Sequence, residues 1–317
     1  ICDCREPRGA LRRSAARLSA AIGVLLGALA LAGCGIGLGP PGVRLVITRN
    51  FGGQVLSRSG ILKAGSHETV LGLLRAHDAV VAGSSPYTVQ RIAGVAAGQQ
   101  GGSFLRWFDY VNGLAVSKRL LNTTIHPGDH VWWDLNEAAQ EVPAVVGSYP
   151  EPFLNGLEGK RLPVRIECAT ATASACQTVI SRLRALGVPA AVSAIGSGAA
   201  PETLRVMVAP WSRLEGVLAQ ELERGPESSG VYARFSQRGK ELQLLDPQAS
   251  TTQTLTSGAG LIAALRAPKE APVWVITGTD QLGVDRAARS LDEATLANRF
   301  AVALDPAGAL ALPRAAG

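Results

Sequence analysis

The sequence predicts an α+β fold in which a small first domain is followed by a separate α/β domain. The elements predicted for residues 43–136 are, in order, a hairpin, a helix, a strand, a hairpin and a strand. Residues 163–317 instead alternate strands with helices, which is typical of an α/β layer. Residues 137–162 contain scattered prolines and glycines, and we interpret them as an inter-domain linker.

The first half of the small domain is predicted to be a hairpin followed by a helix. Residues 43–49 favour a strand, the glycine pair at 52–53 turns the chain, and residues 55–62 can return as the partner strand. A helix is expected over residues 69–77, because its apolar residues share one face. Ser66 is the expected N-cap of this helix.

The second half of the domain is predicted to be entirely β-structure. Residues 87–92 alternate like a strand, and residues 104–111 and 130–135 are aromatic-rich strands. The Asn-Gly pair at 112–113 is a strong hairpin signal, since both residue types tolerate positive φ. Residues 127–129, Pro-Gly-Asp, favour another turn. The complete order describes a β-grasp-like α+β plan.

The second domain has longer helices between its strands. Gly187 is expected to end the first of these helices. The predicted strands are residues 164–168, 204–209, 231–236, 241–245, 272–277 and 300–304. The predicted helices are residues 171–186, 211–223, 261–266 and 280–296.

The first 33 residues have the order of charge and hydrophobicity found in a secretory signal. Five arginines precede an apolar run at residues 18–32, which at about fifteen residues is shorter than the roughly twenty that a transmembrane helix needs. The run ends in Leu31-Ala32-Gly33-Cys34, which resembles the lipobox of bacterial lipoproteins. The alternative is a plain apolar helix with a buried Cys34.

This resemblance implies an exported protein that is anchored through a lipid on Cys34. Residues 1–33 would be the lipoprotein signal peptide, and residues 34–42 would be a Gly/Pro tether between the lipid and the folded part. We therefore expect an extracytoplasmic protein held at the cell membrane.

The charge balance argues against a nucleic-acid partner. Residues 1–33 hold five Arg, one Asp and one Glu, so their removal lowers the formal net charge from +6 to +3. The remaining sequence shows no stripe of Lys and Arg, which is the electrostatic footprint of a nucleic-acid-binding protein.

Cys168 and Cys176 are predicted to form a local disulfide. They are the two cysteines that follow Cys34, and an oxidising compartment favours their pairing. A free, buried pair is the alternative. A zinc site is not expected, because the spacing is not CxxC and no histidine lies nearby in the sequence.

Aromatic residues gather between residues 104 and 133. Trp132 and Trp133 are neighbours on one predicted strand, so they cannot face the same side, and one ring of each adjacent pair is expected to be exposed. Exposed rings suit a flat apolar ligand or a carbohydrate, whereas the alternative is that the rings fill a thin core. The candidate ligand-binding residues are Tyr87, Trp107, Tyr110, Asn112 and Trp133.

Two stretches of the first domain carry a family resemblance: residues 107–113, Trp-Phe-Asp-Tyr-Val-Asn-Gly, and residues 127–134, Pro-Gly-Asp-His-Val-Trp-Trp-Asp. They resemble the family related to the carboxy-terminal domain of transcobalamin and intrinsic factor. The resemblance covers residues 43–136 and implies a β-grasp-like fold, with cobalamin or a related small molecule as the candidate ligand. Bacterial members of that family are often uncharacterised lipoproteins.

The histidines give no clear metal motif. His67, His77, His126 and His130 all lie in the first domain. His126 and His130 flank a Pro-Gly turn, and we expect them to be solvent-exposed turn residues. Because neutral imidazole is a common metal ligand, a lower-axial ligand to cobalt is the alternative. No HExxH pattern is present, and no metal site is predicted.

No catalytic residues are predicted. The second domain contains no G-x-S-x-G nucleophile elbow and no histidine that could act as a base. Residues 277–280, Thr-Gly-Thr-Asp, stand where α/β proteins often bind ligands, but we interpret Asp280 as an N-cap and Gly278 as a turn residue. The acids that follow are expected on a solvated helix face, and they are Asp285, Asp292 and Glu293.

The sequence thus predicts a lipid-anchored extracytoplasmic binding protein without enzymatic activity. Its partners would be the membrane and a small molecule captured for uptake, with cobalamin as the named candidate. The alternative is a structural or interaction lipoprotein of the cell envelope, which binds protein or polysaccharide.

Overall fold

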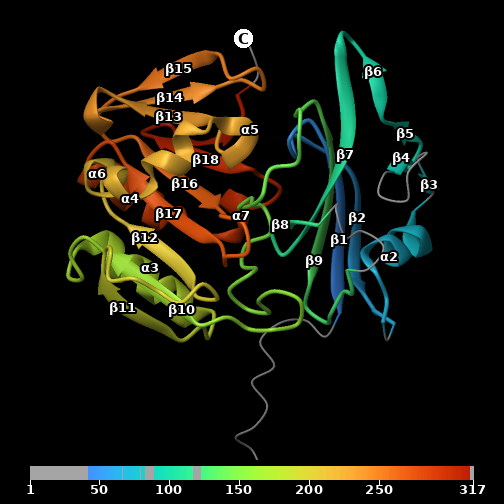
Figure 1. The fold of residues 1–317 in the computed structure, drawn as a ribbon, viewed down its shortest axis with the longest axis horizontal. Helices are drawn as coiled ribbons and strands as arrows, with labels where there is room; N and C mark the ends of the chain where they lie inside the picture. The colour runs from blue at the N-terminus through green and yellow to red at the C-terminus, as the bar shows by residue number, and fades with distance from the viewer. Residues whose placement is uncertain (1–41, 66, 79, 83–88, 117–122, 315–317) are drawn as a thin grey trace, which may run out of the picture. The chain divides into compact units, whose positions relative to one another are not determined.

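The computed structural model describes residues 42–65, 67–78, 80–82, 89–116 and 123–314, and it consists of strands and helices arranged in several sheets (Figure 1). The predicted mixture of α and β structure is therefore confirmed. Among the described helices, none is both long and apolar enough to span a membrane. The predicted signal peptide and Cys34 lie outside the described residues.

The N-terminal sheet has the strand order β2-β1-β9-β7-β6, with β8 paired to β7. Its strands are β1 (Val43–Arg49), β2 (Gln54–Leu62), β6 (Gly98–Gln100), β7 (Ser103–Val111), β8 (Leu114–Ala115) and β9 (His130–Asn136). The first and last strands, β1 and β9, pair in parallel, and the other pairs are antiparallel. The two predicted hairpins are confirmed: β1 with β2, and β7 with β8.

A helix and a small antiparallel sheet cover one face of the N-terminal sheet. They are α2 (Val70–His77), β3 (Val80–Ala82), β4 (Val89–Ile92) and β5 (Val95–Ala96). The helix begins after Thr69, whose Oγ1 accepts a hydrogen bond from the Gly72 N–H at 3.1 Å. Thr69 is therefore the N-cap, and the predicted cap at Ser66 was wrong.

The C-terminal sheet has the order β11-β10-β12-β17-β16-β18-β19. Its first four strands are parallel, and they are β10 (Val164–Cys168), β11 (Ala190–Ala194), β12 (Leu204–Val208) and β17 (Val273–Gly278). The antiparallel strands are β16 (Gly260–Leu265), β18 (Ala301–Asp305) and β19 (Gly308–Leu312). A separate three-stranded sheet contains β13 (Ala233–Ser236), β14 (Glu241–Leu245) and β15 (Thr251–Leu255).

Of the four helices predicted for this region, two are found at the expected positions, one is a strand and one divides into two, and a further short helix was not predicted. The helices are α3 (Ser174–Ala185), α4 (Trp211–Glu223), α5 (Pro226–Ser229), α6 (Gln281–Arg289) and α7 (Glu293–Leu296), with a 3-10 turn η2 (Gln237–Gly239). The helix predicted over residues 261–266 is wrong, because these residues lie in β16 between β17 and β18. All six residues of β16 are buried, so its apolar run carries no periodicity that could distinguish a strand from a helix.

Two predicted boundaries also change. The helix predicted over residues 280–296 divides into α6 and α7, since Asp292 interrupts it and caps α7 by accepting the Thr295 N–H at 2.9 Å. The strand expected to close the chain, β18, is followed by β19.

Both faces of the N-terminal sheet are covered. Trp132 and Trp133 are 0% and 1% exposed and lie in different clusters. Trp133 joins the cluster beneath α2, whereas Trp132 packs against Phe300 with ring centroids 5.5 Å apart. The expectation that one ring of each adjacent pair is exposed was therefore wrong for the two tryptophans, because residues from β18 and its surroundings cover the second face.

Residues 137–162 contribute to these cores. Val145 lies in the cluster with Trp132, and Tyr149 and Phe153 lie in the cluster beneath the C-terminal sheet. The Val146 N–H donates to the carbonyl of Phe300 at 3.2 Å. The segment thus packs on both sheets, and its designation as an inter-domain linker stays a prediction.

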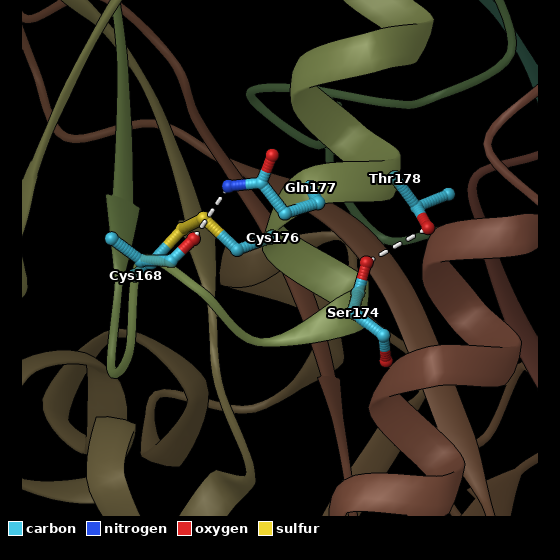
Figure 2. Close-up of a disulfide and its surroundings, with 6 residues drawn as sticks. Cys168, Ser174, Cys176, Gln177 and Thr178 are labelled. Carbon is cyan, nitrogen blue, oxygen red and sulfur yellow. Dashed lines mark hydrogen bonds between the residues drawn. A yellow bond between two sulfur atoms is a disulfide. The ribbon is translucent and has the colours of Figure 1, made fainter.

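The predicted disulfide between Cys168 and Cys176 is confirmed (Figure 2). It joins the end of β10 to the first turn of α3, with the two Cα atoms 6.1 Å apart. Gly187 follows α3 with φ +71°, as expected for a residue that ends a helix.

Loss of this disulfide should destabilise the fold. Replacing both residues, Cys168→Ala with Cys176→Ala, is expected to lower the free energy of unfolding by about 2.5 kcal/mol, because the unfolded chain loses a closed loop. Guanidinium unfolding with and without a thiol reductant measures this change. The reductant should lower the stability of the wild type by a similar amount and leave that of the variant unchanged. Equal stability of wild type and variant without reductant would contradict the prediction.

Candidate functional site

The predicted ligand-binding residues do not form one open surface. Trp107 and Trp133 are buried beneath α2, and Tyr110 is buried on the opposite face beside Trp132, with ring centroids 5.4 Å apart. Tyr87 lies outside the described residues. The three described rings therefore pack in the core, as in the alternative interpretation of the aromatic cluster.

Asn112 is buried and joins two turns. Its Nδ2 donates to Asp129 Oδ1 at 2.8 Å and to the Gly156 carbonyl at 2.9 Å, and its Oδ1 accepts the His130 N–H at 2.9 Å. Asn112 and Gly113 have φ of +53° and +81°, as the hairpin signal predicted. The Asn-Gly pair at 112–113 and the Gly-Asp pair at 128–129 thus hold the β7–β8 hairpin against the turn before β9.

A cleft of about 500 Å³ opens beside this junction. One side is the end of the β7–β8 hairpin with Asn112 and Asp129, and the other is the loop at residues 266–269 that leads from β16 to β17. Aliphatic residues make up much of the lining, and they are Val111, Leu114, Ala115, Val116, Pro143, Leu157, Ala267 and Pro268. Among the described residues that line the cleft, none is aromatic.

Charged groups of both signs face the cleft. Asp129 is a buried acid of the lining, with Glu141 and Glu158 as further acids, and Arg266 and Lys269 are the bases. The Arg266 Nε donates to the Glu270 carbonyl at 3.0 Å. Lys269 is exposed, has φ +67°, and forms no ion pair with any residue that the structure describes.

Asp129 is held in place by two donors. Its Oδ1 accepts the Asn112 side chain, and its Oδ2 accepts the His126 N–H at 2.7 Å. Burial raises the pKa of Asp129 above its ordinary value, while the hydrogen bonds from His126 and Asn112 lower it. The carboxylate lies at the wall of the cleft, and the Nδ1 atom of His126 is 3.6 Å from its Oδ2.

The histidines are placed differently from the prediction. His67 and His77 are exposed and His126 is half-buried, but His130 is buried, so the expectation of an exposed turn histidine was wrong for His130. Burial, together with the charges of Arg44 and Arg58, lowers the pKa of His130 to about 4. Within the described residues, no three His, Cys, Asp or Glu side chains are arranged to hold a metal ion.

Asp280 is the N-cap of α6, as predicted. Its carboxylate accepts the Gly283 N–H at 2.9 Å, and it also accepts the Gly258 N–H and the Ser257 hydroxyl, each at 2.8 Å. Gly278 is not a turn residue: it ends β17, and a Cβ there would lie 2.6 Å from the Ala259 carbonyl oxygen. The end of β17 therefore packs closely against Ala259.

The acids that follow Asp280 were expected on a solvated face, but each has a partner. Asp285 accepts the Ser174 hydroxyl at 2.6 Å, and Glu293 forms a 2.6 Å ion pair with Arg44. Asp292 is the cap of α7 described above.

The cleft residues Asp129, Arg266 and Lys269 were not predicted as a site. Asp129 was identified only as a turn residue, and the loop at 266–269 has no recognisable motif, so only the folded chain brings them together. No protein-family model matches the chain, and a search of curated proteins finds no match either.

Proposed function

We propose that this chain is a lipid-anchored extracytoplasmic binding protein that captures a small molecule in the cleft and catalyses no reaction. The cleft itself carries the proposal. Its volume of about 500 Å³ lies in the range of small-molecule sites, and it combines an aliphatic lining with a few fixed polar groups. Asp129 is the best-fixed of these groups, because Asn112 and His126 hold both of its oxygens.

The proposed location rests on the sequence and on the disulfide. Residues 1–33 would direct export, and Cys34 would carry the lipid at the end of the 34–42 tether. The Cys168–Cys176 bond supports this location, since such bonds persist in oxidising compartments and are rare in the cytosol.

Cys34→Ala should abolish membrane anchoring. We expect the wild type to enter the detergent phase in a Triton X-114 partition and the variant to lose the lipid mass on its N-terminal peptide. Cys2→Ala is the matched control and should leave the lipid in place. A variant at Cys34 that retains the lipid would refute this anchor.

We also propose that residues 43–136 form a β-grasp-like domain. The support is the parallel pairing of β1 with β9 in the middle of the N-terminal sheet, with hairpins outside them and α2 against one face. The division into this domain and an α/β domain from residue 163 is part of the same proposal.

Cobalamin remains a candidate through the family resemblance alone. The geometry favours a smaller ligand, because the described lining of the cleft offers no aromatic ring against which a corrin could lie and no histidine that could ligate cobalt. A corrinoid is therefore one arm of the binding test.

Ala267→Trp tests the cleft by filling it. Ala267 lines the cleft and is half-buried, so the larger side chain should displace a ligand without disturbing the core. Native mass spectrometry of the chain isolated from membranes should show a bound small molecule in the wild type and its loss in Ala267→Trp. Ala309→Trp, at an exposed position of β19, is the control and should retain the ligand.

The same preparations decide between the ligand classes. A shift in corrinoid absorbance on mixing would establish cobalamin binding. Recovery of envelope protein or polysaccharide, with no small molecule in any preparation and no corrinoid shift, would overturn the proposal in favour of an interaction lipoprotein.

A further inference from the structure

We infer that the cleft binds a short peptide with aliphatic side chains and free termini, whose ammonium group contacts Asp129 and whose carboxylate contacts Lys269. This inference names the ligand class of the proposed function and rests on it. It follows from the two kinds of surface in the cleft: an aliphatic wall, and isolated charges of opposite sign contributed by distant parts of the chain.

The aliphatic wall indicates the side chains of the ligand. Leu114 and Val116 come from β8 and the residue after it, and Leu157 comes from the segment before β10. Branched aliphatic groups contact such a surface well, whereas a flat aromatic ligand gains most from a partner ring, which the described lining lacks. Carbohydrates, which bind mainly on aromatic faces, are disfavoured for the same reason.

Asp129 indicates a cation at one end of the ligand. It is 1% exposed, and each of its oxygens accepts one hydrogen bond from the described residues, which leaves a lone pair on each oxygen. His126 Nδ1 stands 3.6 Å from Oδ2, too far for a normal hydrogen bond. An ammonium group would donate charge-assisted hydrogen bonds to the remaining lone pairs of this buried carboxylate.

Lys269 indicates an anion at the other end. It stands in a loop beside Pro268, exposed and with no ion pair among the described residues, and its φ of +67° is unusual for a residue with a Cβ. Such backbone conformations are concentrated at binding sites, where the surrounding structure maintains them. The terminal carboxylate of a peptide is the matching group.

The test uses the full chain in detergent and peptides that differ only at their ends. Isothermal titration calorimetry is performed with Leu-Ala, Ala-Leu-Ala and Ala-Leu-Leu-Ala, each with free ends, with an acetylated N-terminus, or with an amidated C-terminus. At least one free peptide should bind. Acetylation and amidation should each weaken its binding to the wild type at least tenfold.

Two variants assign each end of the peptide to its residue. In Asp129→Asn the penalty for acetylation should disappear while the penalty for amidation remains. In Lys269→Met the penalty for amidation should disappear while the penalty for acetylation remains. Lys240→Met, at an exposed site on the C-terminal side of η2, is the control and should behave as the wild type. The capped peptides test the inference on the wild type even if Asp129→Asn fails to fold.

The outcomes separate this inference from the proposed function. Equal binding of free and capped peptides would overturn the inference. The inference would also be overturned if no peptide binds to the chain although native mass spectrometry finds a small molecule that Ala267→Trp loses. In that case the proposed function stands. If no peptide binds and no small molecule is found, both fail.

Discussion

Replacing Asp134 with alanine is expected to lower the free energy of unfolding by about 3–5 kcal/mol, because it breaks a buried network of hydrogen bonds. This carboxylate is fully buried near the end of β9 and accepts four hydrogen bonds. Its Oδ1 accepts the Thr48 hydroxyl at 2.5 Å and the Gly52 N–H at 2.8 Å. Its Oδ2 accepts the Phe51 N–H at 3.0 Å and the Asn136 side chain at 2.8 Å. Alanine would leave these donors buried without an acceptor, which is costlier than losing the hydrogen bonds alone.

The effect should extend to the aromatic core. The turn that Asp134 holds places the Phe51 ring 5.3 Å from Tyr232 and 5.1 Å from Phe300. We expect Asp134→Asn to lower the free energy of unfolding less than Asp134→Ala does, because the amide keeps one acceptor oxygen. Glu202→Ala removes an exposed carboxylate and should change stability by under about 0.5 kcal/mol. Urea unfolding followed by tryptophan fluorescence measures all three, and a loss below about 1 kcal/mol in Asp134→Ala would refute this role.

The residues that the sequence marks most clearly are structural. Asn112 and Gly113 were identified as a turn, and they form one, because positive φ is a local requirement that the residue types reveal. Glycine is required at position 113 for a second reason, which is not local: a Cβ atom there would lie 2.6 Å from the Val145 carbonyl oxygen. The motif thus predicted the local fold correctly, while the contact that also requires it depends on a distant segment.

Features set by distant contacts could not be predicted in this way. The strand β16 was predicted as a helix, because a run of apolar residues that is buried on both faces looks alike in either element. One of the rings of Trp132 and Trp133 was expected to be exposed, but Phe300, which directly precedes β18, covers Trp132. The cleft was missed for the same reason, since its two sides are far apart in the sequence.

Two buried groups near the start of β9 should give opposite pH dependences of stability. Burial is the main cause that raises the pKa of Glu151 from 4.5 to about 7; the charge of Asp129 also raises this pKa, while hydrogen bonds from Asn155 lower it. Burial lowers the pKa of His130 from 6.5 to about 4. Both side chains are therefore neutral in the folded protein between about pH 4.5 and 6.5, where the unfolded chain carries both charges.

The signs follow from which state holds the proton. Glu151 keeps its proton longer in the folded state, so its stabilisation is complete below pH 4.5 and is lost as the pH rises to about 7. His130 loses its proton more readily in the folded state, so its stabilisation is complete above pH 6.5 and is lost as the pH falls to about 4. Each shift corresponds to about 3 kcal/mol, and the two should largely cancel in the wild type.

Single variants should separate the two contributions. In Glu151→Gln, the free energy of unfolding should rise by up to about 3 kcal/mol from pH 4 to 6.5, because His130 then acts without the opposing effect of Glu151. In His130→Phe, it should fall by a similar amount from pH 4.5 to 7, and Asp129, whose pKa is also raised by burial, should act in the same direction as Glu151. His130→Phe should break no strong hydrogen bond, since neither ring nitrogen has a partner of normal geometry among the described residues. Urea unfolding across this pH range tests the pair, and slopes of the same sign in both variants would show that the two groups do not titrate as their burial requires.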